Sequence, residues 1–173
     1  MQWQLISWLP LFAPIIAVAV YETIKRRERS LVSGWSTVLV AALMLPTVAS
    51  ISTGGTPAAV SADLWWATAW FALYFGGSIY YVKTLIRDFG NRTRFIQSVI
   101  FHAIVCVAAM GLALAQPHTW PVAVVSALLL ARSYAIPRIA QRRGKRIPPK
   151  YVGMVDGVVT VFVVAAAFAA FGC

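Results

Sequence analysis

Six long apolar runs, separated by short polar segments, are the feature that most constrains the fold of this chain. A helix needs about 20 residues to cross the hydrocarbon core of a bilayer, and each run is close to that length. The spans are predicted at approximately 3–21, 31–51, 64–82, 95–115, 120–136 and 151–171. The chain is therefore predicted to be all-α, a polytopic membrane helix bundle with six transmembrane helices, in which residues 1–173 form a single transmembrane bundle.

The composition excludes an ordinary soluble domain. Of the 173 residues, 60% are hydrophobic and only 12% are charged, whereas soluble domains average about 45–50% apolar and 25% charged residues. Six spans occupy most of the chain, so little is left for a domain outside the membrane. Any function must therefore be carried by the helices and their short loops.

The basic residues predict the orientation of the bundle. All fifteen Lys and Arg residues fall in or beside three loops, namely those after the first run, after the third run and around the last two runs. The remaining loops, residues 52–63 and 116–119, contain no Lys or Arg. Because the cytoplasmic loops of membrane proteins carry the excess of basic residues, we expect the three basic loops inside and both termini outside.

Several short motifs extend over essentially the whole chain. The motifs are Pro14-Ile15-Ile16-Ala17-Val18, Arg29-Ser30-Leu31-Val32-Ser33-Gly34, Tyr81-Val82-Lys83-Thr84-Leu85-Ile86-Arg87 with Gly90-Asn91, Phe101-His102-Ala103, Leu130-Ala131-Arg132 and Pro149-Lys150-Tyr151-Val152-Gly153. Together these motifs resemble the YwiC-like family of bacterial integral membrane proteins. The resemblance implies a multi-pass protein of the bacterial cytoplasmic membrane, and it implies no particular activity.

Members of that family usually begin with a segment that contains His-Gly-Ala-Trp, and this segment is absent here. The chain therefore resembles the later two thirds of a family member that lacks about three helices. An outside N-terminus without a signal sequence is an awkward start for a membrane protein. Three preceding helices would remove this difficulty, because they would place the start of the whole protein inside.

A second resemblance concerns architecture alone. Nine-helix prenyltransferases of the UbiA type carry an aspartate-rich motif for Mg²⁺ and a diphosphate in the cytosolic loop after their sixth helix. If three helices are missing before the first span, the loop from Lys83 to Arg94 would fall at that position, but it contains one acidic residue, Asp88. A Mg²⁺-diphosphate site needs paired carboxylates, so we do not expect prenyl transfer by that mechanism.

The cysteines also predict no metal site. Cys106 and Cys173 lack the neighbouring ligands that zinc requires, so we expect no metal site and no cofactor.

A basic helix face predicts a binding site for an anionic headgroup. If the third span continues as a helix into the following loop, Tyr80, Lys83, Thr84 and Arg87 share one face. We assign the candidate site to Lys83, Thr84 and Arg87, together with Asn91. The alternative is that these residues only set the topology, with their side chains reaching toward lipid headgroups.

The fourth run carries a polar stripe that includes Ser98 and His102. His102 lies eight residues after Arg94, which corresponds to about 12 Å of helix. Ionisable groups at such a depth normally face the bundle interior or a cavity. Ser98 and His102 are therefore predicted to line a cavity beside the basic face. The alternative role for His102 is an interhelical hydrogen bond.

An intramembrane ion pair is predicted between Arg132 and Asp156. Each lies twelve positions from Gly144, the midpoint of the hairpin that joins the last two spans. Antiparallel helices then bring them to similar depth. Gly153 and Gly157 flank the carboxylate and predict a close approach between helices. Proton relay or substrate binding is the alternative role for these two residues.

Two classes of function remain open. The first is a non-catalytic membrane module that binds membrane lipids, expected to be anionic, or a membrane-protein partner such as the missing helices. The second is a divergent membrane enzyme or carrier for a phosphorylated isoprenoid-like lipid. The basic segment 138–150 favours anionic lipid. Because it offers no interleaved aromatic residues and no folded basic module, nucleic acid is not an expected partner.

Cysteine labelling tests the predicted orientation. In a chain with Cys106 and Cys173 replaced by Ser, single cysteines within 52–63 or 116–119 should react with an impermeant maleimide added to intact cells. A cysteine in place of Gly144 should react only after the cytoplasmic face has been opened to the reagent. Labelling of either predicted outer loop from the cytoplasmic face alone would contradict the six-span arrangement.

Overall fold

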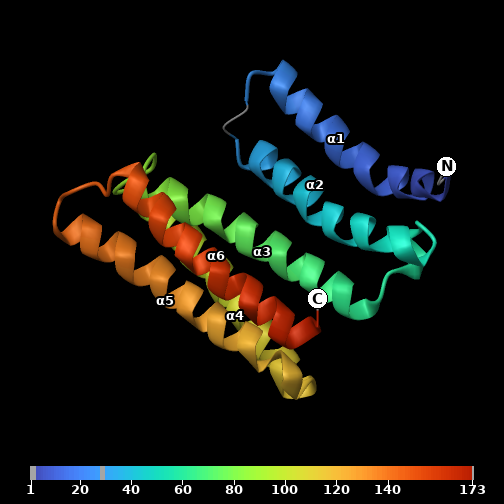
Figure 1. Ribbon diagram of the computed structural model, residues 1–173. Coiled ribbons are helices and arrows are strands. Elements are labelled where there is room, and N and C mark those ends of the chain that lie inside the picture. The colour runs from blue at the N-terminus through green and yellow to red at the C-terminus, as the bar shows by residue number, and fades with distance from the viewer. Residues whose placement is uncertain (1–2, 28–29, 173) are drawn as a thin grey trace. The chain divides into compact units, whose positions relative to one another are not determined.

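The computed structural model describes residues 3–27 and 30–172, so Arg29 of the first basic loop lies outside the described residues. In these ranges the chain forms six α-helices and short 3-10 turns but no strand, which confirms the predicted all-α class (Figure 1). The helices are α1 (Leu9–Ile24), α2 (Leu31–Ser50), α3 (Ala62–Leu85), α4 (Arg92–Ala115), α5 (Trp120–Arg142) and α6 (Pro149–Phe171). The chain divides into two compact units, Met1–Gly76 and Gly77–Cys173, and α3 begins in the first and ends in the second.

Five helices of the described part are long and apolar enough to cross a membrane. These candidate spans are Trp3–Ile24, Leu31–Thr53, Arg92–Ala115, Pro117–Arg142 and Pro149–Phe171. Helix α3 has a sufficient length of 24 residues, but its apolar residues are mixed with Asp, Thr, Ser and Gly. The chain is thus a multi-pass membrane protein. The crossing by α3 and the orientation of both termini stay predictions.

In the first unit, Trp8 attaches the start of the chain to the loop between α2 and α3. Its side chain is buried, and its indole N–H donates to the carbonyl oxygen of Gly55 over 3.2 Å. Its ring centroid lies 5.9 Å from that of Trp65. The loop turns back at Gly54 and Gly55, where φ is 113° and 75°, a left-handed backbone conformation that glycine adopts without steric cost.

A buried carboxylate links the end of α1 to the start of α2. Glu22 accepts a hydrogen bond from the hydroxyl of Ser30, and Ser30 in turn caps the start of α2 by accepting from the backbone N–H of Ser33 over 2.9 Å. The cap satisfies one of the N–H groups that a helix leaves unpaired at its start. Through Ser30, Glu22 at the end of α1 therefore supports the cap of α2.

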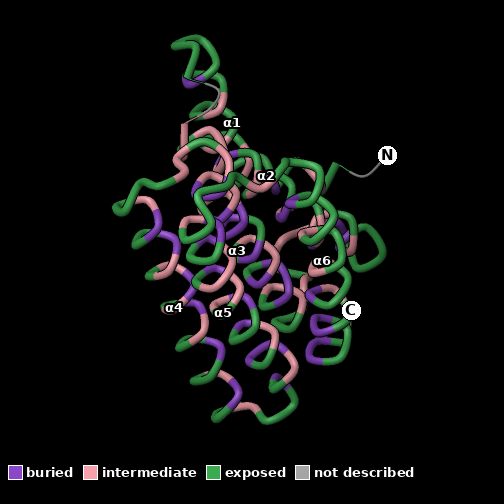
Figure 2. The backbone as a smooth tube through the Cα atoms, turned by 90° about the vertical axis from the view of Figure 1, so that its left-hand side faces the viewer, coloured by how far each residue is buried: buried purple, intermediate pink, exposed green. Residues whose placement is uncertain are grey.

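The second unit contains the end of α3 and the helices α4, α5 and α6. Helices α4 and α5 pack along each other, and α5 packs against α6. A buried cluster of Tyr81, Leu85 and Val152 joins the end of α3 to the start of α6. Along α4 and α5, buried and exposed positions alternate with the helical turn (Figure 2). This alternation is the pattern of helices that pack through one face.

Helix α5 continues further than the sequence indicates. We expected the fifth span to end at Ile136 and Pro137 to open a basic loop, but the helix runs through Pro137 to Arg142. A proline removes one backbone hydrogen bond and bends a helix without necessarily ending it. Both Pro137 and Ala140 are buried, and this packing offsets the lost bond. Arg138 and Gln141 therefore lie on a helix and not in a loop.

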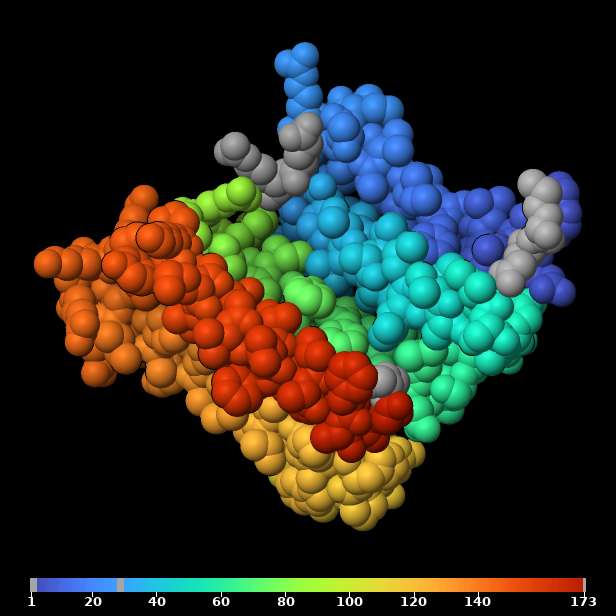
Figure 3. Space-filling model, viewed as in Figure 1, coloured from blue at the N-terminus to red at the C-terminus, as the bar shows by residue number. Residues whose placement is uncertain are grey.

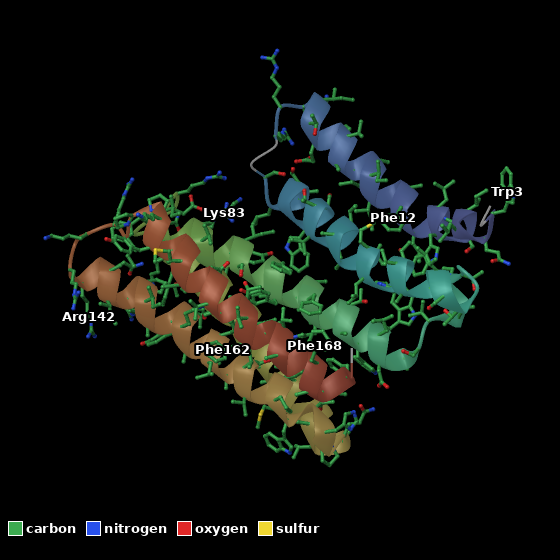
Figure 4. All side chains as sticks on the ribbon, in the orientation of Figure 1. Trp3, Phe12, Lys83, Arg142, Phe162 and Phe168 are labelled. Carbon is green, nitrogen blue, oxygen red and sulfur yellow. The ribbon has the colours of Figure 1, made fainter. Side chains whose placement is uncertain are left out.

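Large apolar side chains cover the outer surface of the second unit. On α4, Val107 and Leu114 are 72% and 75% exposed. On α6, Phe162 and Phe168, which are labelled in Figure 4, are also exposed. In water such contiguous apolar surface leads to aggregation. In a bilayer it contacts the acyl chains, in agreement with the membrane assignment.

The contact between Gly76 and Trp35 provides a test of packing in the first unit. A Cβ atom at Gly76 would lie 2.2 Å from Cη2 of Trp35. Gly76→Ala should therefore lower stability by about 1–3 kcal/mol through overpacking, measured by thermal unfolding in detergent micelles. Gly111→Ala is the matched control, because a Cβ there meets nothing within 4 Å.

The control should be neutral or stabilising by up to about 1 kcal/mol, since alanine favours a helix more than glycine does. Replacing Trp35 with Leu in the Gly76→Ala chain should restore part of the loss. Equal melting temperatures for Gly76→Ala and Gly111→Ala would contradict the packing described here.

Candidate functional site

A largely buried ion pair joins α5 to α6 in the second unit. Nη1 of Arg132 on α5 donates to Oδ1 of Asp156 on α6 over 2.7 Å. The side chains are 8% and 24% exposed, respectively. The structure thus brings together the two residues that the hairpin geometry predicted to pair. Since an isolated charge inside a membrane is costly, each residue makes the burial of the other possible.

Helix α3 contributes two further contacts to this pair. The guanidinium carbon of Arg132 lies 4.2 Å from the ring centroid of the buried Tyr81. The hydroxyl of Ser78 donates to Oδ1 of Asp156 over 3.4 Å. An aromatic face stabilises a cation, and a hydroxyl stabilises a carboxylate. The ion pair is therefore the point at which α3, α5 and α6 meet.

The sequence reasoning missed Ser78 and Tyr81 as members of this site. Their spacing of three residues places them on one face of α3, which is a signal that could have been used. However, the sequence alone does not say which face of α3 turns toward α5 and α6.

Arg132 keeps hydrogen-bonding capacity after it has paired with Asp156. Its Nε and Nη2 atoms are buried and have no hydrogen-bond partner among the described residues. A guanidinium has five N–H donors in a fixed planar arrangement. The remaining donors of Arg132 are suited to a second acceptor, such as water or an anionic group, within the bundle.

Ser98 and His102 lie on the face of α4 that packs against α3. The ring of His102 is buried, and its Nδ1 donates to the carbonyl oxygen of Ser98 over 2.8 Å. A Cβ atom at Gly77 would lie 3.0 Å from Nε2 of His102, so the two helices approach closely there. Tyr80 stacks on Phe101 beside this contact, with centroids 5.1 Å apart. The predicted cavity at Ser98 and His102 stays a prediction.

The residues assigned to a headgroup site lie at the end of α3 and in the turn after it, and their common role stays a prediction. Helix α3 ends at Leu85, but the backbone N–H of Arg87 still donates to the carbonyl oxygen of Lys83 over 3.1 Å, as in an α-helix. The N–H of Asp88 donates to the same oxygen over 2.8 Å. The turn that follows has Gly90 at φ 84°.

The side chains of these residues differ in what they offer to a ligand. Thr84 is buried and donates to the carbonyl oxygen of Tyr81, and Asn91 caps α4 by accepting from the N–H of Arg94. The charged groups of Lys83 and Arg87 are closer to the surface. Partial burial lowers the pKa of the Lys83 ammonium, and the nearby charge of Arg87 acts in the same direction.

The two basic loops of the second unit meet at one end of it. The guanidinium carbon of Arg146 lies 5.8 Å from the ring centroid of Phe89, which connects the α5–α6 turn to the α3–α4 turn. Lys83 and Arg142 lie at this end in Figure 4, and Phe168 lies near the opposite end. In Figure 3 the orange surface of the α5–α6 turn borders the green surface at the end of α3. We call residues 83–94 and 138–150 the basic end.

Comparisons with known proteins agree with the predicted resemblance. The family model described as "YwiC-like protein" matches residues 1–49, which confirms the resemblance to that family over this segment. A protein from Haemophilus influenzae, described as "Uncharacterized protein", is 27% identical over 158 residues. The match covers 91% of this chain and 60% of that protein. No solved structure matches the chain.

Neutralising Asp156 tests the ion pair. Asp156→Asn leaves the buried charge of Arg132 without a counter-ion and should lower stability by about 3 kcal/mol or more. Asp63→Asn is the control, because Asp63 is exposed in the first turn of α3 and contributes about 0.3–1 kcal/mol through the helix dipole. Thermal unfolding in micelles measures both, and equal losses would show that the pair does not stabilise the unit.

Proposed function

We propose that this chain is a non-catalytic module of the bacterial cytoplasmic membrane that binds anionic lipid at the basic end of its second unit. The observation that carries the proposal is the contact between Arg146 and Phe89, which joins two loops that are far apart in sequence. Residues 83–94 contain four Lys or Arg, and residues 138–150 contain six. Each such residue near an anionic bilayer surface contributes roughly 1 kcal/mol of attraction.

The charge balance within the basic end supports this proposal. Asp88 is its one acidic residue, and its carboxylate pairs with Nε of Arg94 at 3.5 Å. The other nine Lys and Arg residues of the two loops therefore have no further carboxylate within these loops to balance their charge. Lipid phosphates supply counter-charge where the ends of the helices meet the headgroup region.

The proposal includes an orientation. The basic end faces the cytoplasm, α3 is the third of six spans, and both termini of this chain lie outside. The concentration of Lys and Arg in alternate loops supports this arrangement. The relative from Haemophilus influenzae supports a bacterial protein, and the apolar helices support a membrane location. A membrane-protein partner, such as further helices, is the other occupant that this module would accept.

A second candidate function is a divergent enzyme or carrier for a phosphorylated isoprenoid-like lipid. The two nitrogen atoms of Arg132 that have no partner in the described part of the chain, Nε and Nη2, favour it, because they could hold an anionic group inside the bundle. The pairing of Arg132 with Asp156 argues against it, since the positive charge is already compensated.

Native mass spectrometry of the purified chain tests the proposal. With equimolar phosphatidylglycerol and phosphatidylcholine, we expect bound phosphatidylglycerol to predominate. Replacing the four cations of residues 142–146 with Gln should reduce this preference strongly. Replacing Lys25, Arg26 and Arg27 of the first basic loop with Gln should leave most of it in place. Equal binding of the two lipids by the unchanged chain would refute the proposal.

A further inference from the structure

A cleft of about 480 Å³ opens at the basic end, between the start of α4 and the end of α5. Its lining combines two arginines and an amide with two apolar side chains and a glycine. The lining residues are Gly90, Arg92, Phe95, Ile96, Arg138 and Gln141. This volume lies within the range of small-ligand sites, which is about 300–1,000 Å³. The cleft includes none of the four residues that the sequence assigned to a headgroup site.

The continuation of α5 through Pro137 creates this cleft. It places Arg138 and Gln141 three residues apart on one helix face, beside the start of the antiparallel α4. On α4, Arg92 and Phe95 have the same spacing. Each helix therefore contributes one cation with a neighbouring side chain, and the two cations line a common space.

Aromatic rings hold Arg138 in position. Its guanidinium carbon lies 5.6 Å from the ring centroid of Phe95 and 5.9 Å from that of Tyr134. The two rings also contact each other, with centroids 5.9 Å apart. A guanidinium stacked on an aromatic ring keeps the N–H donors at its edge free for an anion. Arg138 is thus oriented before a ligand arrives, which lowers the entropic cost of binding.

The carboxylates of the second unit are already paired with other arginines. Asp88 pairs with Arg94, and Asp156 pairs with Arg132. Residues 77–172 contain no further Asp or Glu. Within the second unit, no further Asp or Glu side chain is therefore available to pair with Arg92 and Arg138.

We propose that this cleft binds the phosphate group of an anionic lipid, with Arg92 and Arg138 as the phosphate ligands and the side-chain amide of Gln141 as a further donor. This inference rests on the proposed lipid-binding function and names its specific site. Arginine suits the role because its parallel N–H groups match the oxygens of a phosphate in a bidentate arrangement.

The surface beside the cleft favours a lipid over free phosphate. Ile96 in the cleft is followed on the same face of α4 by Ile100 and Ile104, which are 53% and 64% exposed. These residues are four apart and form an apolar stripe that leads from the cleft toward the membrane interior. A phosphate in the cleft would leave an acyl chain free to lie along this stripe.

Paired variants with an added lipid test the inference. Phosphatidic acid should raise the melting temperature of the micellar protein, and phosphatidylcholine should not. Arg92→Gln and Arg138→Gln should each weaken the apparent affinity for phosphatidic acid by about tenfold or more. Arg142→Gln and Arg143→Gln remove the same charge from exposed residues outside the cleft lining, so each should cost only the attraction of one surface charge, about fivefold or less. Arg138→Lys should stay weakened, because lysine keeps the charge but lacks the planar donors.

Each outcome separates this inference from the proposed function. If all four Gln variants lose affinity equally, the cleft is not the site, although anionic lipid still binds at the basic end. If the unchanged chain responds equally to both lipids, the proposed function fails as well. Inorganic phosphate is the third probe: stabilisation by millimolar phosphate equal to that by phosphatidic acid would overturn the lipid as the source of the phosphate. Melting without lipid identifies any variant that fails to fold.

Discussion

A charge inside a bilayer requires a partner, and the second unit meets this requirement with the ion pair of Arg132 and Asp156. The pair connects α5 to α6, and the contacts with Ser78 and Tyr81 add α3. Non-polar packing alone gives helices in lipid little directional preference, because acyl chains are as apolar as the side chains. A charged contact has a defined geometry. The ion pair therefore determines which faces of these helices meet.

The remaining charges of the second unit gather outside the apolar parts of the helices. The basic end is held together by contacts between cations and rings, namely Arg146 with Phe89 and Arg138 with Phe95. In these contacts a guanidinium group packs on an aromatic ring, and the N–H donors at its edge stay free to bind an anion. The proposed lipid site uses these N–H donors of Arg138. The ion pair in the interior needs no external ligand for its own charge balance. Anchoring within the bundle and recognition at its end thus involve different residues.

The sequence predicted the helices and the ion pair because both depend on local spacing. Apolar runs of membrane-spanning length predict helices, and the equal distances of Arg132 and Asp156 from Gly144 predict a contact in an antiparallel hairpin. Features that depend on neighbouring helices were missed or misplaced. We expected a close approach at Gly153 and Gly157, but a Cβ at either would meet nothing within 4 Å, whereas one at Gly76 or Gly77 meets a ring of the adjacent helix. The continuation of α5 through Pro137 also depends on neighbouring helices, because the burial of Pro137 and Ala140 offsets the lost hydrogen bond.

A double-mutant cycle tests most directly whether the ion pair organises the second unit. The unfolding free energies of Arg132→Gln, Asp156→Asn and the double variant are compared with that of the unchanged chain under identical micelle conditions. If the pair is the organising contact, the double variant loses less stability than the sum of the two single losses, with a coupling energy of about 1–3 kcal/mol. Strictly additive losses would contradict this account, because they would mean that each charge stabilises the unit independently of the other.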